Sequence, residues 1–363
     1  MKRKRILSLA ALLAVLSYAT PASAEVKFGG EAAIRVRDDF GHTRSAAGVT
    51  KNTEDQYFQY RVRLKPSADL GDGYFFKGLI QNEEVAGSWQ TVAASNTEKY
   101  NLEVSQFYFG RNLANSHYSI GRIPLGSLDN PILDLTLYAV PGTGPQGSKL
   151  YAVDTPISTN HFDRLLGFNY GAKIGGGEFN AVLVNFDNLS STATATHGLL
   201  NDGYGLYANY KTTAGNVTIV PQGFYSVTRI SDGRRPYSLG AQAFIPAGKS
   251  KVSLSGFYTA DHNTYKGSNW DYSGYIFRVK GESGPVTAWV DYNQTKDKST
   301  ATTVDYDNLF VWASYKVNVH EAATGSFSVT PTLRYRASGS QAAGAGKAEN
   351  DLLRTEVYAT VTF

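Results

Sequence analysis

Apolar and polar side chains alternate along most of this chain of 363 residues, from Val26 to Phe363. The segment 58–65 (FQYRVRLK) is typical, because every second side chain is apolar or aromatic and the side chains between them are polar or basic. A period of two predicts β-strands with one apolar and one polar face. Sixteen strands are predicted in this way: 26–37, 56–69, 73–85, 99–112, 115–124, 163–174, 177–187, 202–212, 216–229, 236–246, 250–261, 271–281, 285–296, 305–319, 325–337 and 351–363.

The predicted connections alternate between short and long. The short ones are 70–72, 113–114, 175–176, 213–215, 247–249, 282–284 and 320–324. The long ones are 38–55, 86–98, 125–162, 188–201, 262–270, 301–304 with its flanking residues and 338–350, and 230–235 is the shortest of this set. Short turns on one rim and long loops on the other are the layout of a transmembrane β-barrel. With both chain ends on the short-turn rim, the strand count is even.

The alternation also predicts that the sheet is closed. Hydrocarbon cannot satisfy free backbone N–H and C=O groups, so a sheet in lipid has no open edge. Alternate positions from Phe58 to Leu64 form an apolar row that suits lipid, and alternate positions from Thr330 to Arg336 form a polar row that suits water. The predicted fold class is therefore all-β, a transmembrane antiparallel β-barrel of sixteen strands. Eighteen strands is the alternative, if 132–139 and 149–154 form a further pair.

The two ends of the chain fit this fold. The last nine residues, 355–363 (TEVYATVTF), alternate up to a terminal aromatic. This ending resembles the closing strand of bacterial outer-membrane proteins, where the last strand pairs with the first. At the other end, four basic residues precede the apolar run 6–16, and Ala22-Ser23-Ala24 follows it. This pattern predicts a cleaved signal peptide over 1–24 and a barrel domain over 25–363.

Composition narrows the function. The chain has 35 Lys and Arg against 31 Asp and Glu, but the predicted leader holds four of the bases, which leaves 31 of each sign. Without a basic excess, a nucleic-acid partner is not predicted. The chain has no cysteine, which excludes disulfides and thiolate catalysis, and its six histidines show no i, i+4 pair. We therefore predict neither a metal nor any other cofactor.

A barrel of sixteen to eighteen strands leaves an aqueous lumen. The longest predicted loop, 125–162, follows the fifth strand and is the one segment long enough to narrow that lumen. In this layout, in Gly121-Arg122 and in the strand–turn–strand stretch 162–184, the chain resembles the general diffusion porins of Gram-negative bacteria. It lacks the PEFGG-like turn of that family and has Asp129-Asn130-Pro131 instead.

The resemblance implies a passive channel for small hydrophilic solutes and ions, a homotrimer in lipid and lipopolysaccharide, and a location in the outer membrane. It also implies a constriction in which loop carboxylates face basic residues of the wall. The matching residues are Asp129 and Asp134 on the loop and Arg35, Arg61, Arg63 and Lys77 on the first three strands. Arg37 and Arg111 are expected nearer the rims. Because inward bases outnumber inward acids, we expect a mild preference for anions. The alternative is that the alternating arginines are simply a solvated surface of the lumen and form no constriction.

Two other functions are open. Some outer-membrane barrels are lipases or proteases, but no local motif here supports a nucleophile with its base. A barrel can also be a sleeve for an electron-transfer partner, which would need a lumen free of an inserted loop. The sequence favours a channel that uses neither energy nor a cofactor.

Overall fold

The computed structural model describes residues 25–82, 89–95, 97, 101–124, 165–186, 188, 202–229, 234–265 and 267–363. All secondary-structure elements in these ranges are β-strands. No helix among the described residues has the length and apolar character needed to cross a membrane.

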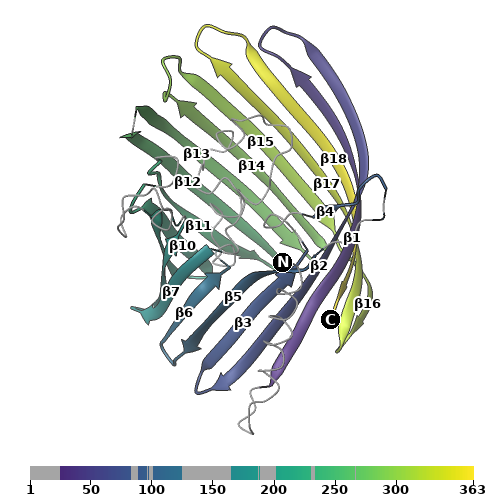
Figure 1. The fold of residues 1–363 in the computed structure, drawn as a ribbon, viewed down its shortest axis with the longest axis vertical. Helices are drawn as coiled ribbons and strands as arrows, with labels where there is room; N and C mark the ends of the chain where they lie inside the picture. The colour runs from purple at the N-terminus through teal and green to yellow at the C-terminus, as the bar shows by residue number, and fades with distance from the viewer. Residues whose placement is uncertain are drawn as a thin grey trace, which may run out of the picture.

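Sixteen strands form a closed antiparallel barrel, in which each strand pairs with the strands before and after it (Figure 1). This confirms the predicted fold class and strand number, whereas the alternative pair at 132–139 and 149–154 lies outside the described residues. The strands are β1 (Val26–Arg44), β2 (Thr50–Gly71), β3 (Tyr74–Gln81), β5 (Glu103–Asn112), β6 (Ser116–Ile123), β7 (Leu165–Ile174), β8 (Gly177–Asn185), β9 (Tyr204–Ala214), β10 (Val217–Ser226), β11 (Tyr237–Ala247), β12 (Ser250–Tyr265), β13 (Ser268–Ser283), β14 (Val286–Asp297), β15 (Val304–Tyr315), β17 (Gly325–Ala342) and β18 (Lys347–Thr362).

Two short strands extend members of this ring. β4 (Gln90–Thr91) pairs with β2 beyond the end of β3, and β16 (Val317–Ala322) continues β15 along β17. Each fills a position that its longer neighbour leaves open, so neither adds a further strand to the ring.

The barrel closes where the first strand meets the last. β1 and β18 pair from Glu31 opposite Thr362 to Arg44 opposite Glu349, and Figure 1 shows them side by side. The terminal residue completes this seam: the Gly30 N–H donates to the Phe363 carbonyl at 2.8 Å. A Cβ on Gly30 would lie 2.7 Å from the Phe363 ring, so glycine leaves the space that the terminal aromatic occupies. The predicted pairing of the last strand with the first is confirmed.

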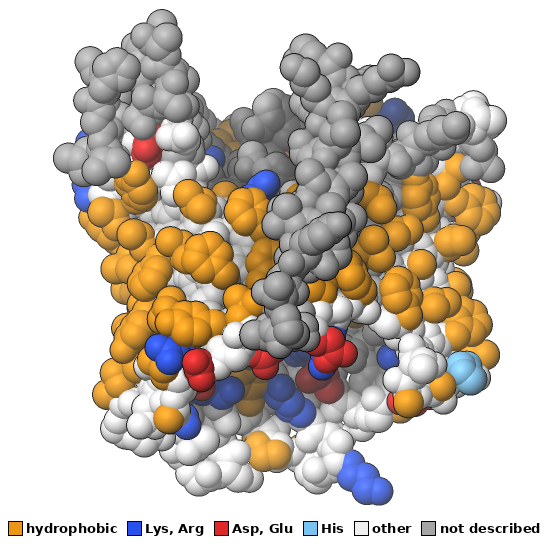
Figure 2. Space-filling view, turned by 60° about the horizontal axis from the view of Figure 1, so that its bottom comes forward, with side chains coloured by type: hydrophobic (Ala, Val, Ile, Leu, Met, Phe, Trp, Pro, Cys, Tyr) orange, Lys and Arg blue, Asp and Glu red, His pale blue; other side chains and the backbone are white. Residues whose placement is uncertain are grey.

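The two faces of the wall differ as the alternation predicts. Outward side chains are apolar and exposed, and Figure 2 shows a broad band of hydrophobic side chains on the outside of the barrel, with charged groups below it. On β2, for example, Phe58 is 54% exposed on the outside and its neighbour Gln59 is buried on the inside. Because lipid covers the outer face, the exposed apolar side chains are in their preferred solvent.

The short connections are tight turns at one rim. The β2–β3 turn places Asp72 and Gly73 at φ values of 50° and 80°. Positive φ at both central residues is the conformation that suits the twist of a two-residue hairpin.

Three of the predicted long loops are mostly strand, which corrects the sequence analysis. Most of 38–55, 262–270 and 338–350 pairs in the ladders of β1 with β2, β12 with β13 and β17 with β18. The prediction ended each strand where apolar alternation stopped. Apolar and polar side chains alternate only where one face of the strand meets lipid. The backbone hydrogen bonds of a hairpin continue beyond the membrane into water, so the strands are longer than the alternation.

Candidate functional site

Arginines gather on the inner face of four neighbouring strands, β17, β18, β1 and β2. On β1 and β2 the odd-numbered side chains point inward, and on β17 and β18 the even-numbered ones do, because opposite residues in the register share a face. The buried and half-buried charged side chains on these inner faces are seven arginines and three carboxylates. We call them the arginine wall: Arg35, Arg37, Arg61, Arg63, Arg334, Arg336 and Arg354, with Glu31, Asp39 and Glu356.

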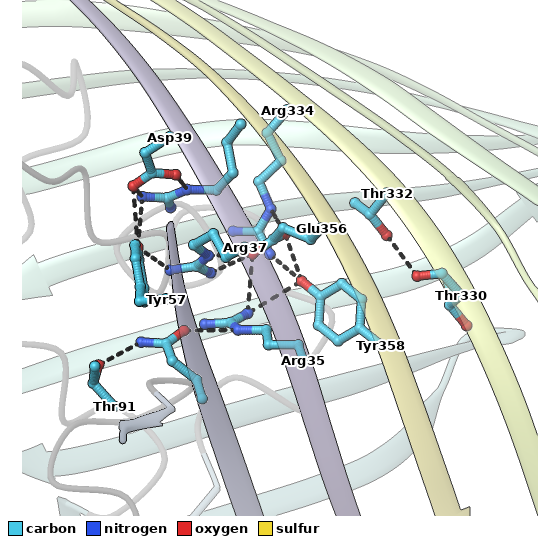
Figure 3. A network of polar contacts seen from close by, with 12 residues as sticks. Arg35, Arg37, Asp39, Tyr57, Thr91, Thr330, Thr332, Arg334, Glu356 and Tyr358 are labelled. Atoms are coloured by element: carbon cyan, nitrogen blue, oxygen red, sulfur yellow. Dashed lines mark hydrogen bonds and ion pairs between the residues drawn. The ribbon is translucent and has the colours of Figure 1, made fainter. Parts of the chain in front are cut away.

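Glu356 lies at the centre of the wall, and its side chain is 0% exposed (Figure 3). Its carboxylate accepts from Arg37 Nε at 2.5 Å, and it lies 2.6 Å from Arg334 Nε and 3.3 Å from Arg35 Nη1. Tyr358 also donates to it, at 2.7 Å. One carboxylate thus contacts three guanidinium groups from β17 and β1, and its charge-assisted hydrogen bond with Arg37 is stronger than a neutral one.

A second pair crosses the seam beside Glu356. Arg354 Nε and Nη2 donate to the two carboxylate oxygens of Asp39 at 2.5 and 2.6 Å. The Tyr57 hydroxyl donates to Asp39 at 3.0 Å and accepts from Arg37 Nη1 at the same distance. This fork geometry fixes the guanidinium plane, so the first and last strands are joined by side chains as well as by their backbone ladder.

The wall continues from β1 toward β3 through Arg61 and Arg63. Arg61 Nε donates to Glu31 at 2.7 Å, and Arg63 Nε donates to Gln81 at 3.1 Å. The Arg61 and Arg63 side chains are 16% and 18% exposed, more than the 5% of Arg35. These two side chains therefore keep more contact with solvent than the Arg35 side chain does.

Aromatic rings cover several of the guanidinium groups. The Arg334 Cζ lies 3.8 Å from the Trp312 ring centroid, and Trp312 stacks on Trp289 at 4.6 Å with an interplanar angle of 11°. At the other end, Arg35 and Arg61 lie 4.3 and 4.5 Å from the Trp89 ring. Rings stacked on guanidinium planes leave the N–H edges to meet carboxylates.

The structure separates the predicted basic residues into two groups. Arg35, Arg61 and Arg63 belong to the arginine wall. Lys77 points inward but lies nearer the short-turn rim, where it is exposed and 5.4 Å from the Phe75 ring. The loop residues Asp129 and Asp134 lie outside the described residues.

The two arginines expected near the rims also differ. Arg111 is at the short-turn rim, where its Nε donates to the Asp72 carbonyl at 3.0 Å, as predicted. The rim position predicted for Arg37 is wrong. Because β1 extends to Arg44, Arg37 lies well inside the barrel, in contact with Glu356.

Sequence reasoning missed the residues that organise the wall, above all Glu356, Asp39 and Trp89. Glu356 stands on the polar face of the alternating last strand, which was the signal that its side chain is inward. Its partners could not be found from that signal, because they depend on the register across the seam.

The arrangement of fixed charges in the wall can act on charged solutes electrostatically. No three His, Cys, Asp or Glu side chains among the described residues come together as a metal site. A lumen wall of fixed guanidinium groups attracts anions and repels cations without any reaction.

Comparisons with known proteins agree with the barrel fold. The family model for Gram-negative porins matches residues 8–351. Among solved structures, the anion-selective porin from Comamonas acidovorans is 15% identical, with 93% of this chain and 100% of that chain covered and a TM-score of 0.55. A loop L8 deletion mutant of OmpT, an outer membrane protein of Vibrio cholerae, is 10% identical, with 92% and 99% covered and a TM-score of 0.53. At these identities the two structures show a shared fold. A search of curated proteins finds no match.

Proposed function

This chain belongs to the Gram-negative porin family, and from that premise we propose that its channel prefers anions among the solutes that it passes. The protein forms an outer-membrane channel for passive diffusion of small hydrophilic solutes and ions. The preference is argued from the charges of this chain alone.

The observation that carries the proposal is the composition of the arginine wall. Its seven guanidinium groups and three carboxylates leave a net of four positive charges on the inner faces of four adjoining strands. The carboxylates are held in contact with arginines, so they do not stand free to attract cations. Charges fixed on a low-dielectric wall concentrate counter-ions in the water beside them.

A planar-bilayer measurement tests the proposal. Purified protein is inserted into a neutral bilayer, and the reversal potential is recorded in a tenfold KCl gradient. We expect a potential of the sign set by chloride, which grows as the ionic strength falls because salt screens the wall over about 10 Å at 0.1 M. A potential of the sign set by potassium would reject an anion preference.

We assign the constriction to the part of the wall formed by Arg35, Arg61 and Arg63. This assignment is supported by their position together on β1 and β2, where Arg35 contacts Glu356 and both Arg61 and Arg63 contact Glu31. Lys77, which is separate from them, is proposed to attract solutes near the short-turn rim. Asp129 and Asp134 are proposed as the opposing loop carboxylates, on the resemblance to diffusion porins alone.

Assembly and processing complete the proposal. By the usual organisation of porins, the protein is a homotrimer in a membrane that contains lipopolysaccharide. Residues 1–24 are proposed to be a cleaved leader. Native mass spectrometry of the protein extracted from outer membranes would give both the number of subunits and a mature chain starting at Glu25.

We propose that the channel is not an enzyme. The support is that its clustered inward charges are guanidinium–carboxylate pairs, which are poor nucleophiles and bases. A hydrolase assay in detergent, run beside the conductance measurement, distinguishes the two: turnover of an ester or peptide without conductance would favour the barrel enzyme.

A further inference from the structure

Trp89 enters the lumen through a break in the register beside β2. Arg63 of β2 lies opposite Gln81, and Tyr60, three residues away on β2, lies opposite Gln90, which is nine residues further along the neighbouring chain. The neighbouring chain therefore carries six more residues than the ladder uses before it rejoins β2 as β4. Thr91 lies opposite the inward Gln59, so the alternation directs Trp89 inward as well.

Hydrogen bonds to β2 hold the chain on the C-terminal side of Trp89. The Val92 N–H donates to the Phe58 carbonyl at 2.9 Å, and Gln59 Nε2 donates to Thr91 Oγ1 at 2.8 Å. Gln59 in turn accepts from Arg35 Nε at 2.8 Å. The backbone that carries the indole is thus anchored to the strand that carries Arg61.

The indole ring of Trp89 lies against the guanidinium groups of two arginines of the wall. The guanidinium carbons of Arg35 and Arg61 lie 4.3 and 4.5 Å from its ring centroid, and the Tyr358 ring meets it edge-on at 5.4 Å and 67°. Trp89 is only 9% exposed in this position. A large aromatic side chain thus covers two of the cations that the proposed function places at the constriction.

We propose that Trp89 is a selectivity-determining residue, because it covers Arg35 and Arg61 and keeps passing anions away from these charges. This inference rests on the proposed function, since it concerns how strongly the same wall attracts anions. An anion in contact with a guanidinium lies about 4 Å from its charge, and one held off by an indole lies about 8 Å away, which halves the attraction. Trp89 therefore sets a milder anion preference than the arginines alone would give.

Substitution of Trp89 tests the inference in the full-length channel. Trp89→Ala is expected to increase the anion-to-cation permeability ratio about twofold. Trp89→Phe keeps an aromatic ring on the guanidinium groups and is expected to stay near the wild-type ratio. Trp270→Ala is the matched control, because Trp270 lies 5.5 Å from Arg234 on another part of the barrel. An unchanged ratio in Trp89→Ala, or an equal change in Trp89→Phe, would overturn the inference.

A single cysteine gives a second test within one folded protein, because the chain has no cysteine of its own. Trp89→Cys is reacted in the bilayer with a methyl or a benzyl thiosulfonate. The methyl adduct should retain the increased ratio, and the benzyl adduct should restore it toward wild type. Equal ratios for the two adducts would contradict the inference. Failure of both the Ala and Cys variants to fold, while Trp270→Ala folds, would assign Trp89 a structural role and overturn it too.

The outcomes separate this inference from the proposed function. A wild-type channel that prefers cations refutes the proposed anion preference, whatever Trp89 does. A wild-type channel that prefers anions, with a ratio that no substitution of Trp89 alters, refutes only the role of Trp89.

Discussion

Glu356→Gln is the sharpest perturbation of the arginine wall, because it removes one charge and keeps the side-chain volume. The wild-type carboxylate lies within 3.3 Å of Arg35, Arg37 and Arg334, with no exposure to solvent. Removing one partner from a buried ion pair costs about 3–5 kcal/mol, because the remaining charges are left uncompensated. Since the arginine side chains keep some contact with lumen water, we expect the lower end, about 3 kcal/mol.

The same substitution changes the field in the lumen. The wall would carry seven positive and two negative charges, a net of five in place of four. One added charge about 8 Å from a passing ion contributes about 0.5 kcal/mol in water, which is about twofold in a permeability ratio. The channel should therefore become less stable and more selective for anions at the same time.

Two measurements on one preparation check this prediction. Urea unfolding in detergent, followed by tryptophan fluorescence, gives the loss of stability, and the reversal potential in dilute KCl gives the change in selectivity. Glu349→Gln is the control, because this carboxylate is on the same strand but is 40% exposed and 3.7 Å from Arg44. An exposed pair contributes about 0–1 kcal/mol, so the control should be close to wild type. If the two variants were equally stable, or if Glu356→Gln shifted toward cations, the account of the wall would be refuted.

Two further predictions concern other parts of the wall. Arg61→Ala combined with Arg63→Ala removes two positive charges and should lower the anion-to-cation ratio about fourfold at low salt, whereas Arg111→Ala at the rim should change it little; unaltered selectivity in the double variant would place the constriction elsewhere. A double-mutant cycle of Asp39→Asn and Arg354→Gln should give a coupling of about 1–3 kcal/mol in urea unfolding, because the pair is bidentate and largely buried. Additive effects would show that the pair does not stabilise the seam.

The periodicity of the sequence predicted the strands, their outer faces and the closure of the barrel. These depend on whether a side chain meets lipid or water, and a period of two reports this directly, as Phe58 and Gln59 show. Strand ends beyond the membrane were predicted less well. The polar residues of β1 up to Arg44 continue the ladder without any contact with lipid.

The contacts of the wall could not be predicted, for a reason that lies in the register. A shift of two residues keeps every side chain on its own face of the sheet. Such a shift between β1 and β18 would place Arg37 opposite Arg354 or Tyr358 in place of Glu356, with the same pattern of inward and outward positions. Only the register in the structure shows whether an arginine lies opposite a carboxylate, which neutralises it, or opposite another arginine, which repels it. Trp89 was missed for a different reason, because it falls in the predicted loop 86–98, where no alternation assigned its side chain to a face.

If the wall sets the ion preference as proposed, several of its side chains serve both barrel closure and selectivity. Three of its ion contacts, from Arg35 and Arg37 to Glu356 and from Arg354 to Asp39, join the first strand to the last. A substitution that changes a charge there alters the electric field in the lumen and also removes an ion contact between β1 and β18. Arg61 and Arg63 lie on β2, away from the seam, with partly exposed side chains. We therefore expect that the selectivity of this channel can be adjusted at the β2 end of the wall with little loss of stability. At Glu356 we expect less freedom, because its carboxylate contributes to the charge of the lumen and also joins the last strand to the first.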